Sequence, residues 1–181
     1  MDFSWKDFWH LVLYLAVVAG LTYFVIHYVG QRTVVDGSSM EPTLSDGDQL
    51  IVDKVSYYFR EPERFDIIVF PYQYEEDTYF IKRIIGLPGE TVRIDEKGTI
   101  YIDGDELVES YGREVIKNAG LAATEQTLGD DEYFVLGDNR NNSTDSRSEE
   151  VGLIHRADIV GRAWVRIYPF DKIGSLMPAA S

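Results

Sequence analysis

The fold is indicated most clearly by Thr78-Tyr79-Phe80-Ile81-Lys82-Arg83-Ile84-Ile85, a run rich in β-branched and aromatic residues. Such residues favour strands, and in a strand Phe80, Lys82 and Ile84 share one face because side chains alternate. A similar composition recurs between turns in six further stretches: residues 49–55, 66–72, 91–94, 99–102, 132–136 and 158–167. Short strands separated by Gly, Pro and Asp-Gly turns predict a mainly β protein with antiparallel sheet.

An apolar segment precedes these strands. Residues 8–31 contain no Asp, Glu, Lys or Arg, and about 20 helical residues suffice to cross a hydrocarbon core of about 30 Å. We therefore expect a short tail (residues 1–7), one transmembrane helix (8–31) and a β-rich domain (32–181) with a polar insertion at about 105–130. A cleaved signal peptide is the main alternative, but the tail has one cation, Lys6, and no clear Ala-x-Ala site follows.

Composition excludes several classes of function. The 181 residues include 17 Lys and Arg against 31 Asp and Glu, a net charge of −14. So acidic a chain does not suit a nucleic-acid-binding protein, because phosphate contacts need clustered cations. The chain has no cysteine, and its three histidines are His10, His27 and His155. A thiol nucleophile is therefore excluded and a zinc site is not expected. We expect no metal and no organic cofactor.

A potential nucleophile follows the apolar segment, in Gly37-Ser38-Ser39-Met40-Glu41-Pro42-Thr43-Leu44. Gly37 permits a sharp turn, and Pro42 pushes the residue before it toward extended geometry. A serine hydroxyl becomes a useful nucleophile only beside a base. Taken alone, this octapeptide is more simply interpreted as an ordinary loop that leads into the β-rich domain.

Lys82 is a candidate for that base. Its neighbours on one face of the predicted strand are apolar, so its amine is either solvated at an edge or desolvated. Desolvation disfavours the ammonium form and lowers the pKa of the amine. An ordinary lysine with a pKa of about 10.4 is only about 0.04% neutral at pH 7, and a fall of about 2–3 units raises that fraction about a hundredfold or more.

A polar loop follows the strand predicted at residues 132–136. It spans residues 137–147 and reads Gly-Asp-Asn-Arg-Asn-Asn-Ser-Thr-Asp-Ser-Arg. Such a loop is commonly a set of Asx turns, and it does not match a calcium-binding loop. The alternative is that it supports a catalytic lysine, with Ser143 orienting the amine and an Asp145–Arg147 ion pair fixing the loop.

Three segments together resemble the signatures of bacterial type I signal peptidases. They are Ser39-Met40-Glu41-Pro42-Thr43-Leu44, Lys82-Arg83-Ile84-Ile85-Gly86-Leu87-Pro88-Gly89-Glu90 and residues 137–147, and they occur in the family's order after an apolar segment. Residues 47–54 and 64–70 are also similar to the family. The resemblance covers nearly all of residues 34–167. The compact, single-anchor form is similar to the enzymes of Gram-positive bacteria.

The resemblance implies a membrane-bound serine endopeptidase with a β-sheet catalytic domain. Such an enzyme removes signal peptides from secreted preproteins through an acyl-enzyme intermediate and needs no cofactor. Ser39 would be the nucleophile and Lys82 the general base. Ser143 would hold the Lys82 amine, while Asp145 and Arg147 would brace the site.

The resemblance also implies how substrate is bound. The Ser39 backbone N–H would form part of the oxyanion hole. Met40, Leu44 and Ile81 would contribute to shallow pockets that admit small side chains, typically alanine at positions −1 and −3. Gly37 stands where some members carry a hydroxyl that donates to the oxyanion, so the second donor stays open. Losing one such donor costs about 10²–10³ in rate.

The partners and the location follow from the same resemblance. The partners would be preproteins emerging from the secretion machinery and a lipid bilayer crossed by residues 8–31, with no nucleic acid. The chain would be a single-pass protein of the cytoplasmic membrane, with its catalytic domain on the extracytoplasmic side. The flanking charges, Lys6 and Arg32, do not fix this orientation by themselves.

Three alternatives remain at this point. A Ser-His-Asp hydrolase would need His155 as the base, oriented by Asp145 or Asp138. A self-cleaving repressor would use a Ser-Lys pair on a related β fold, but it would need a DNA-binding segment. The third is a catalytically inactive, membrane-anchored β-domain that acts as a binding or scaffold protein.

Overall fold

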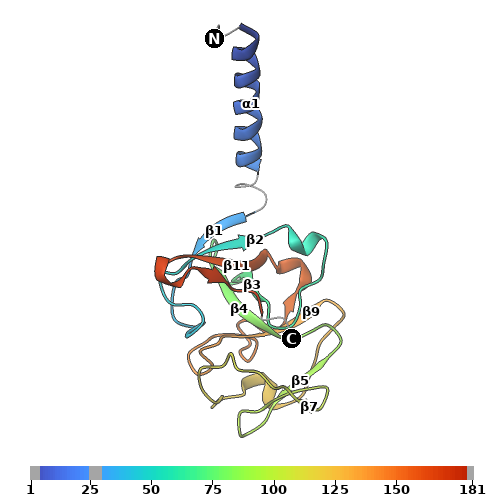
Figure 1. Cartoon of the computed structure of the whole chain (residues 1–181). Helices are drawn as coiled ribbons and strands as arrows, with labels where there is room; N and C mark the ends of the chain where they lie inside the picture. Colours follow the sequence, from blue (N-terminus) through green and yellow to red (C-terminus); the bar gives the residue numbers. More distant parts are fainter. Residues whose placement is uncertain (1–4, 25–29, 179–181) are drawn as a thin grey trace.

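The computed structural model describes residues 5–24 and 30–178. It has one α-helix, α1 (Trp5–Phe24), which stands apart from a β-rich body (Figure 1). The strands are β1 Gly30–Val34, β2 Gln49–Asp53, β3 Ile67–Pro71, β4 Tyr79–Gly86, β5 Thr91–Ile94, β6 Ile100–Ile102, β7 Asp105–Glu106, β8 Gln126–Thr127, β9 Glu132–Leu136, β10 Ile154–His155, β11 Gly161–Tyr168 and β12 Gly174–Ser175. Short 3₁₀ helices are η2 Ser56–Tyr58, η3 Gly120–Ala123, η4 Arg156–Asp158 and η5 Phe170–Lys172.

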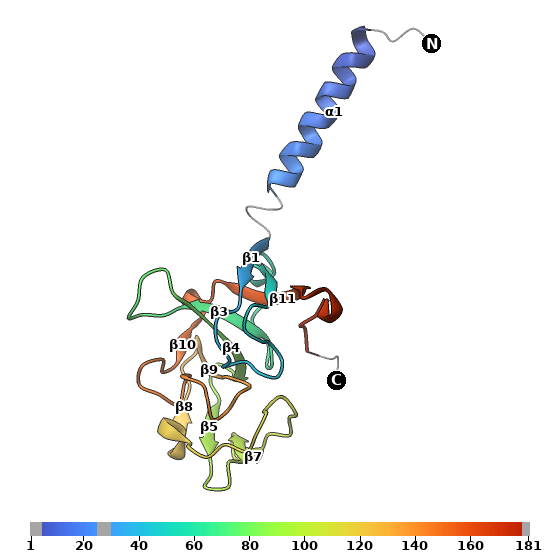
Figure 2. The ribbon, with the colours of Figure 1, turned by 90° about the vertical axis from the view of Figure 1, so that its left-hand side faces the viewer.

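The strands form two antiparallel sheets. The larger sheet has the order β1-β2-β11-β3-β4-β9-β10, with β12 paired to β11, and the smaller has the order β7-β6-β5-β8. Figure 2 shows the smaller sheet at the end of the body away from β1. The predicted antiparallel, mainly β fold is confirmed, and each of the seven predicted stretches contains a strand. The predicted insertion at 105–130 supplies both edge strands of the smaller sheet, β7 and β8.

The last long strand, β11, lies in the middle of the larger sheet. It pairs with β2 on one side and β3 on the other. Its residue Arg166 donates to the backbone oxygen of Thr43 (3.0 Å) and pairs with Asp48 (2.9 Å). The C-terminal part of the chain therefore holds the segment between β1 and β2, which carries the candidate nucleophile.

Residues 8–31 are described only in part. The helix begins at Trp5, ahead of the predicted boundary, and β1 begins at Gly30, inside the predicted segment. Residues 25–29 lie outside the described part of the chain. Within the described part, no helix combines the length and the apolar character needed to cross a membrane.

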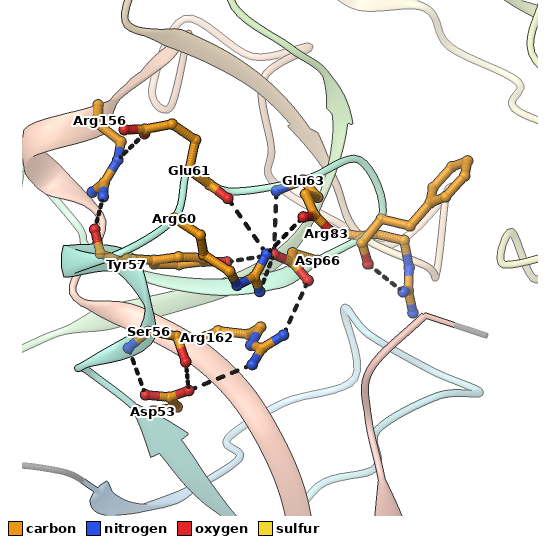
Figure 3. A network of polar contacts seen from close by, with 11 residues as sticks. Asp53, Ser56, Tyr57, Arg60, Glu61, Glu63, Asp66, Arg83, Arg156 and Arg162 are labelled. Carbon is orange, nitrogen blue, oxygen red and sulfur yellow. Dashed lines mark hydrogen bonds and ion pairs between the residues drawn. The ribbon is translucent and has the colours of Figure 1, made fainter. Parts of the chain in front are cut away.

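A polar network fixes where β3 begins (Figure 3). The buried Asp66 carboxylate accepts hydrogen bonds from the Tyr57 hydroxyl (2.9 Å), the Arg60 guanidinium (3.1 Å) and the backbone N–H of Glu63 (3.2 Å). Burial, followed by the neighbouring Asp66 charge, raises the pKa of Tyr57, so its hydroxyl remains a donor. Arg162 of β11 lies 3.8 Å from the same carboxylate. The network ties η2 and β11 to the first residues of β3, the strand that pairs with the lysine-bearing β4.

Asp66→Ala is expected to destabilise the protein by about 3–5 kcal/mol, because it leaves Arg60 and Arg162 without their buried carboxylate. Chemical denaturation of the full chain measures this difference. The control is Glu63→Ala, whose side chain is 74% exposed and whose ion pair contributes about 1 kcal/mol or less. Equal effects of the two changes would contradict a structural role for the Asp66 network.

Candidate active site

Ser39 and Lys82, 43 residues apart in sequence, meet beside the larger sheet. The Nζ atom of Lys82 lies 2.9 Å from the Oγ atom of Ser39. It also donates to the backbone oxygen of Ile81 at 3.1 Å. Strand β4 carries Lys82, which is paired with Ile68 of β3. The two residues predicted as nucleophile and base are therefore within hydrogen-bonding distance.

The Lys82 amine is desolvated. Its side chain is buried, with the residue only 4% exposed, and the Phe80 ring centroid lies 4.8 Å from Nζ. Burial lowers the pKa of Lys82 to about 8, against the opposing effect of the Asp145 charge. About a tenth of the amine is then neutral at pH 7. Neutral Lys82 can accept the Ser39 proton, since the two atoms are already in contact.

A cavity of about 340 Å³ opens over this pair. It is lined by the end of β1, the turn after it, the start of β4 and part of the polar loop: residues 33–40, 79–82 and 142–144. Both reactive side chains face it. An extended chain that enters the cavity would pass directly over the Ser39 hydroxyl.

The polar loop holds the nucleophile turn in place. The Asn139 backbone N–H donates to the Ser39 carbonyl (3.0 Å), and its side-chain amide donates to the Ser38 carbonyl (3.0 Å). The Asn142 amide donates to the Ser38 hydroxyl (2.9 Å). The sequence alone indicated no role for Asn139 or Asn142, although both lie within the polar loop at residues 137–147. Their amides can donate and accept hydrogen bonds, and that property was the available signal.

The Asp145–Arg147 ion pair is present in the structure. Arg147 donates to both Asp145 oxygens at 2.8 Å, and Asp145 also accepts the backbone N–H of Gly137 (3.0 Å). Ser143 is placed differently from the expectation. Its Oγ atom is buried and makes no hydrogen bond within residues 5–24 and 30–178, so it does not hold the Lys82 amine here. It instead packs on Gly137, where an added Cβ would lie 2.2 Å from this Oγ.

A second buried ion pair lies on the opposite face of β4. The Nε and Nη2 atoms of Arg83 donate to Asp138 at 2.8 and 2.6 Å, and both side chains are almost fully buried. The Thr43 hydroxyl donates to the same carboxylate at 2.5 Å. This pair joins β4, the polar loop and the nucleophile turn. Strand alternation placed Arg83 opposite Lys82, but it did not reveal that Asp138 is its partner.

The predicted substrate-contacting residues divide into two groups. Met40 and Ile81 line the cavity, and both are largely buried. Leu44 is fully buried in the core beside Leu50 and does not line the cavity. Leu44 therefore packs the nucleophile turn onto the sheet.

The backbone N–H groups of Gly37 and Ser39 differ in whether they are available to an oxyanion. Gly37 adopts a left-handed conformation, with φ +89°, and its N–H donates to the Asp46 carboxylate (2.9 Å). The Ser39 N–H has no acceptor in the part of the chain that the structure describes. Ser39 can therefore supply one donor, while Gly37 is already occupied.

His155 lies elsewhere. It is on β10, its side chain is 53% exposed, and its ring nitrogens face Asp131 (3.4 Å) and Glu132 (3.9 Å). Neither carboxylate proposed for a Ser-His-Asp triad contacts it. The described residues also contain no group of three His, Asp or Glu side chains that could hold a metal ion.

Comparison with known proteins agrees with this geometry. The family model described as "Signal peptidase, peptidase S26" matches residues 8–168. The chain belongs to the signal peptidase family. The family resemblance predicted from the three motifs is thereby confirmed.

Similar signal peptidases come from Synechocystis, Leptolyngbya and Bacillus. A probable signal peptidase I-2 of Synechocystis is 41% identical over 155 residues, covering 82% of this chain and 68% of its own. Signal peptidase I of Leptolyngbya laminosa is 40% identical over 161 residues, covering 85% and 76%. Signal peptidase I of Bacillus licheniformis is 35% identical over 172 residues, covering 91% and 90%. The chain is thus an enzyme with the signal peptidase I function, a serine peptidase.

Proposed function

We propose that this signal peptidase works by a Ser39–Lys82 dyad and cleaves secreted preproteins after small residues. The observation that carries the proposal is the 2.9 Å contact between the Ser39 hydroxyl and the buried Lys82 amine. A lysine whose pKa is lowered to about 8 is a competent base near neutral pH. A serine with such a base beside it is an activated nucleophile.

The reaction follows from these two groups. Neutral Lys82 takes the Ser39 proton as Oγ attacks the carbonyl carbon of the scissile bond, and the Ser39 N–H donates to the oxyanion. The C–N bond then breaks, and the Lys82 ammonium returns the proton to the departing mature N-terminus. Water, deprotonated by the same amine, attacks the ester. This step releases the signal peptide as a carboxylate and regenerates Ser39.

Specificity for Ala-x-Ala is supported by the lining of the cavity. Met40 and Ile81 present apolar surface beside the dyad. Because their side chains are packed in the core, we infer that the substrate pockets beside them are shallow. Alanine side chains fit such depressions, whereas larger side chains would need displaced core residues.

The proposal includes a membrane anchor formed by residues 8–31, with the β body on the extracytoplasmic side. Support comes from the lack of charge in this segment and from the exposure of apolar side chains along α1, such as Leu13, Leu15 and Leu21. Extraction of cell membranes at high pH tests anchoring, and protease added to intact cells tests the side. Release of the full chain into the soluble fraction would reject the anchor without affecting the dyad.

A synthetic preprotein with an Ala-x-Ala site tests the peptidase. The full chain in detergent is expected to cut after the second alanine, with the new N-terminus read by mass spectrometry. Ser39→Ala should form no product, whereas Ser45→Ala, a serine outside the lining of the cavity, is the control and should keep its activity. Cleavage that survives in Ser39→Ala would reject the dyad, and cleavage at another bond would reject the proposed specificity.

The rate should depend on pH through Lys82. Only the neutral amine accepts the proton, so kcat/KM is expected to rise about tenfold per pH unit below the pKa and to level off above about 8. Initial rates on a substrate without titratable groups near the scissile bond measure the profile. A flat profile from about pH 6 to 9 would contradict Lys82 as the base.

A further inference from the structure

A segment outside the catalytic motifs reaches the active site from the smaller sheet. Residues 109–113, Glu109-Ser110-Tyr111-Gly112-Arg113, follow β7 and belong to the stretch predicted as a polar insertion. We call this segment the strap. None of its residues lines the cavity over the dyad. Its side chains nevertheless contact three elements that position Ser39 and Lys82.

The centre of the strap covers Arg83. The Tyr111 ring centroid lies 3.8 Å from Cζ of Arg83 and 5.0 Å from the Phe65 ring centroid. Arg83 is therefore held by the Asp138 carboxylate through its Nε and Nη2 atoms and by an aromatic ring at close range. A cation over an aromatic face contributes most where both are desolvated, and Arg83 is only 2% exposed. Because Arg83 follows Lys82 on β4, an immobilised Arg83 limits movement of the strand at Lys82.

The first residue of the strap is tied to the polar loop. Glu109 pairs with Arg140 at 2.7 Å, and both side chains are at least nine-tenths buried. The same carboxylate accepts the backbone N–H groups of Tyr111 (2.6 Å) and Gly112 (3.2 Å). Gly112 lies against Arg140, where an added Cβ would be 3.0 Å from Nη1. The strap is thus locked into one conformation on a buried charge.

The last residue of the strap contacts the nucleophile turn. The Arg113 guanidinium pairs with Glu41 at 2.6 Å, two residues after Ser39. The Arg113 backbone N–H donates to the carbonyl of Asp138 (2.8 Å). One end of the strap therefore contacts both the turn that carries Ser39 and the loop that holds this turn.

We infer that the strap is a positioning element for the dyad, with Tyr111 as its principal residue. The inference rests on the proposed function of Ser39 and Lys82. Tyr111 does not touch the reacting atoms; it acts through Arg83. Without its ring, Arg83 keeps its carboxylate but loses the surface that confines it, and the distance between the Lys82 amine and the Ser39 hydroxyl is less well defined. Misplacement of about 1 Å costs up to about 10² in rate.

The test compares Tyr111→Leu with Tyr111→Phe in the full chain. The Tyr111 hydroxyl makes no hydrogen bond to any described residue, so phenylalanine keeps the relevant surface and leucine removes it. We expect Tyr111→Leu to lower kcat about tenfold or more with KM within about twofold. Tyr111→Phe should retain both values. The thermal midpoint of each variant identifies loss of folded protein.

Two results would overturn the inference. One is a folded Tyr111→Leu variant with unchanged kcat, and the other is an equal loss in Tyr111→Phe. If Tyr111→Leu does not fold, Arg113→Gln replaces it, because Arg113 is 47% exposed. Its control is Lys117→Gln, a 78% exposed cation four residues after the end of the strap. Arg113→Gln should lower kcat about threefold, and equality with Lys117→Gln would reject the strap.

A parallel Ser39→Ala assay separates this inference from the proposed function. Activity that is lost in Ser39→Ala but unchanged in a folded Tyr111→Leu variant rejects the strap alone. Activity retained in Ser39→Ala rejects the dyad, whatever the Tyr111 variants do.

Discussion

Lys82→Met is expected to lower kcat by about 10⁴-fold and, at the same time, to make the folded protein more stable. The loss is expected because a general base contributes about 10²–10⁴ in rate and, in the proposed mechanism, Lys82 serves both acylation and deacylation. Methionine has similar length and no charge, so it fills the same site beside Phe80. Single-turnover cleavage of the synthetic preprotein measures the loss. Residual activity above about 1% of the native value would contradict the proposed base.

The gain in stability has a defined pH window. Burial lowers the pKa of Lys82 from 10.5 to about 8 in the folded state, so between these values the unfolded chain binds more protons. The folded state therefore carries a penalty of about 3 kcal/mol below pH 8, which fades as the pH rises toward 10.5. Lys82→Met removes it.

Denaturation at pH 7 and pH 10 measures this window. The stability difference between Lys82→Met and the native chain should be largest at pH 7 and should shrink at pH 10. Lys97→Met is the control, because Lys97 is exposed and should shift stability little at either pH. A Lys82→Met variant that is less stable than the native chain at pH 7 would contradict the desolvation of Lys82.

Gly137→Ala is expected to reduce kcat about 10²-fold and to destabilise the protein by about 1–3 kcal/mol. An added Cβ would lie 2.2 Å from Ser143 Oγ and 2.5 Å from the Ser39 carbonyl oxygen. Both atoms lie too close to an added Cβ. A rotamer change can move the Ser143 hydroxyl but not the Ser39 carbonyl oxygen, which belongs to the backbone. The Ser39 turn or the polar loop must therefore move, and the hydroxyl leaves the reach of Lys82.

Gly174→Ala is the matched control for Gly137→Ala. Gly174 has no atom within 4 Å of an added Cβ and no left-handed backbone, so this variant should keep both its activity and its melting temperature. The assays are preprotein cleavage and thermal unfolding. Normal activity in Gly137→Ala would show that the turn tolerates displacement and that Ser39 is not held as tightly as the contacts indicate.

The sequence predicted the fold well where a strand combines β-branched residues with clear turns. Strands β5 and β9 have the same first and last residues as the stretches predicted from composition, 91–94 and 132–136. The sequence did not predict two-residue strands such as β7 and β12, because two residues are too few to show an alternating pattern. It also did not anticipate β1, which begins at Gly30, near the end of the predicted apolar segment. The five residues of β1 include Gly, Gln and Arg, so composition gives no strand signal there, and the pairing of β1 with β2 decides.

The candidate site was predictable in its chemistry but not in its contacts. An alternating strand with one lysine among apolar neighbours was enough to indicate Lys82. Nothing local in the sequence indicates that Arg83 meets Asp138, 55 residues away, or that Tyr111 stacks on Arg83. Buried charges find partners through tertiary folding, so a single sequence identifies the charge but not its counterion. Ser143 was expected to hold the Lys82 amine, whereas its hydroxyl makes no hydrogen bond to any described residue.

The central position of β11 has a consequence for an enzyme that processes newly made chains. The β1–β2 hairpin, whose connection carries Ser39, and the β3–β4 hairpin, which carries Lys82, are joined through this strand, which ends at Tyr168. A growing polypeptide contains both reactive residues by its 82nd residue, yet the sheet that brings them together lacks an interior strand until residues 161–168 have been synthesised. Nascent chains that end before β11 are therefore expected to lack peptidase activity.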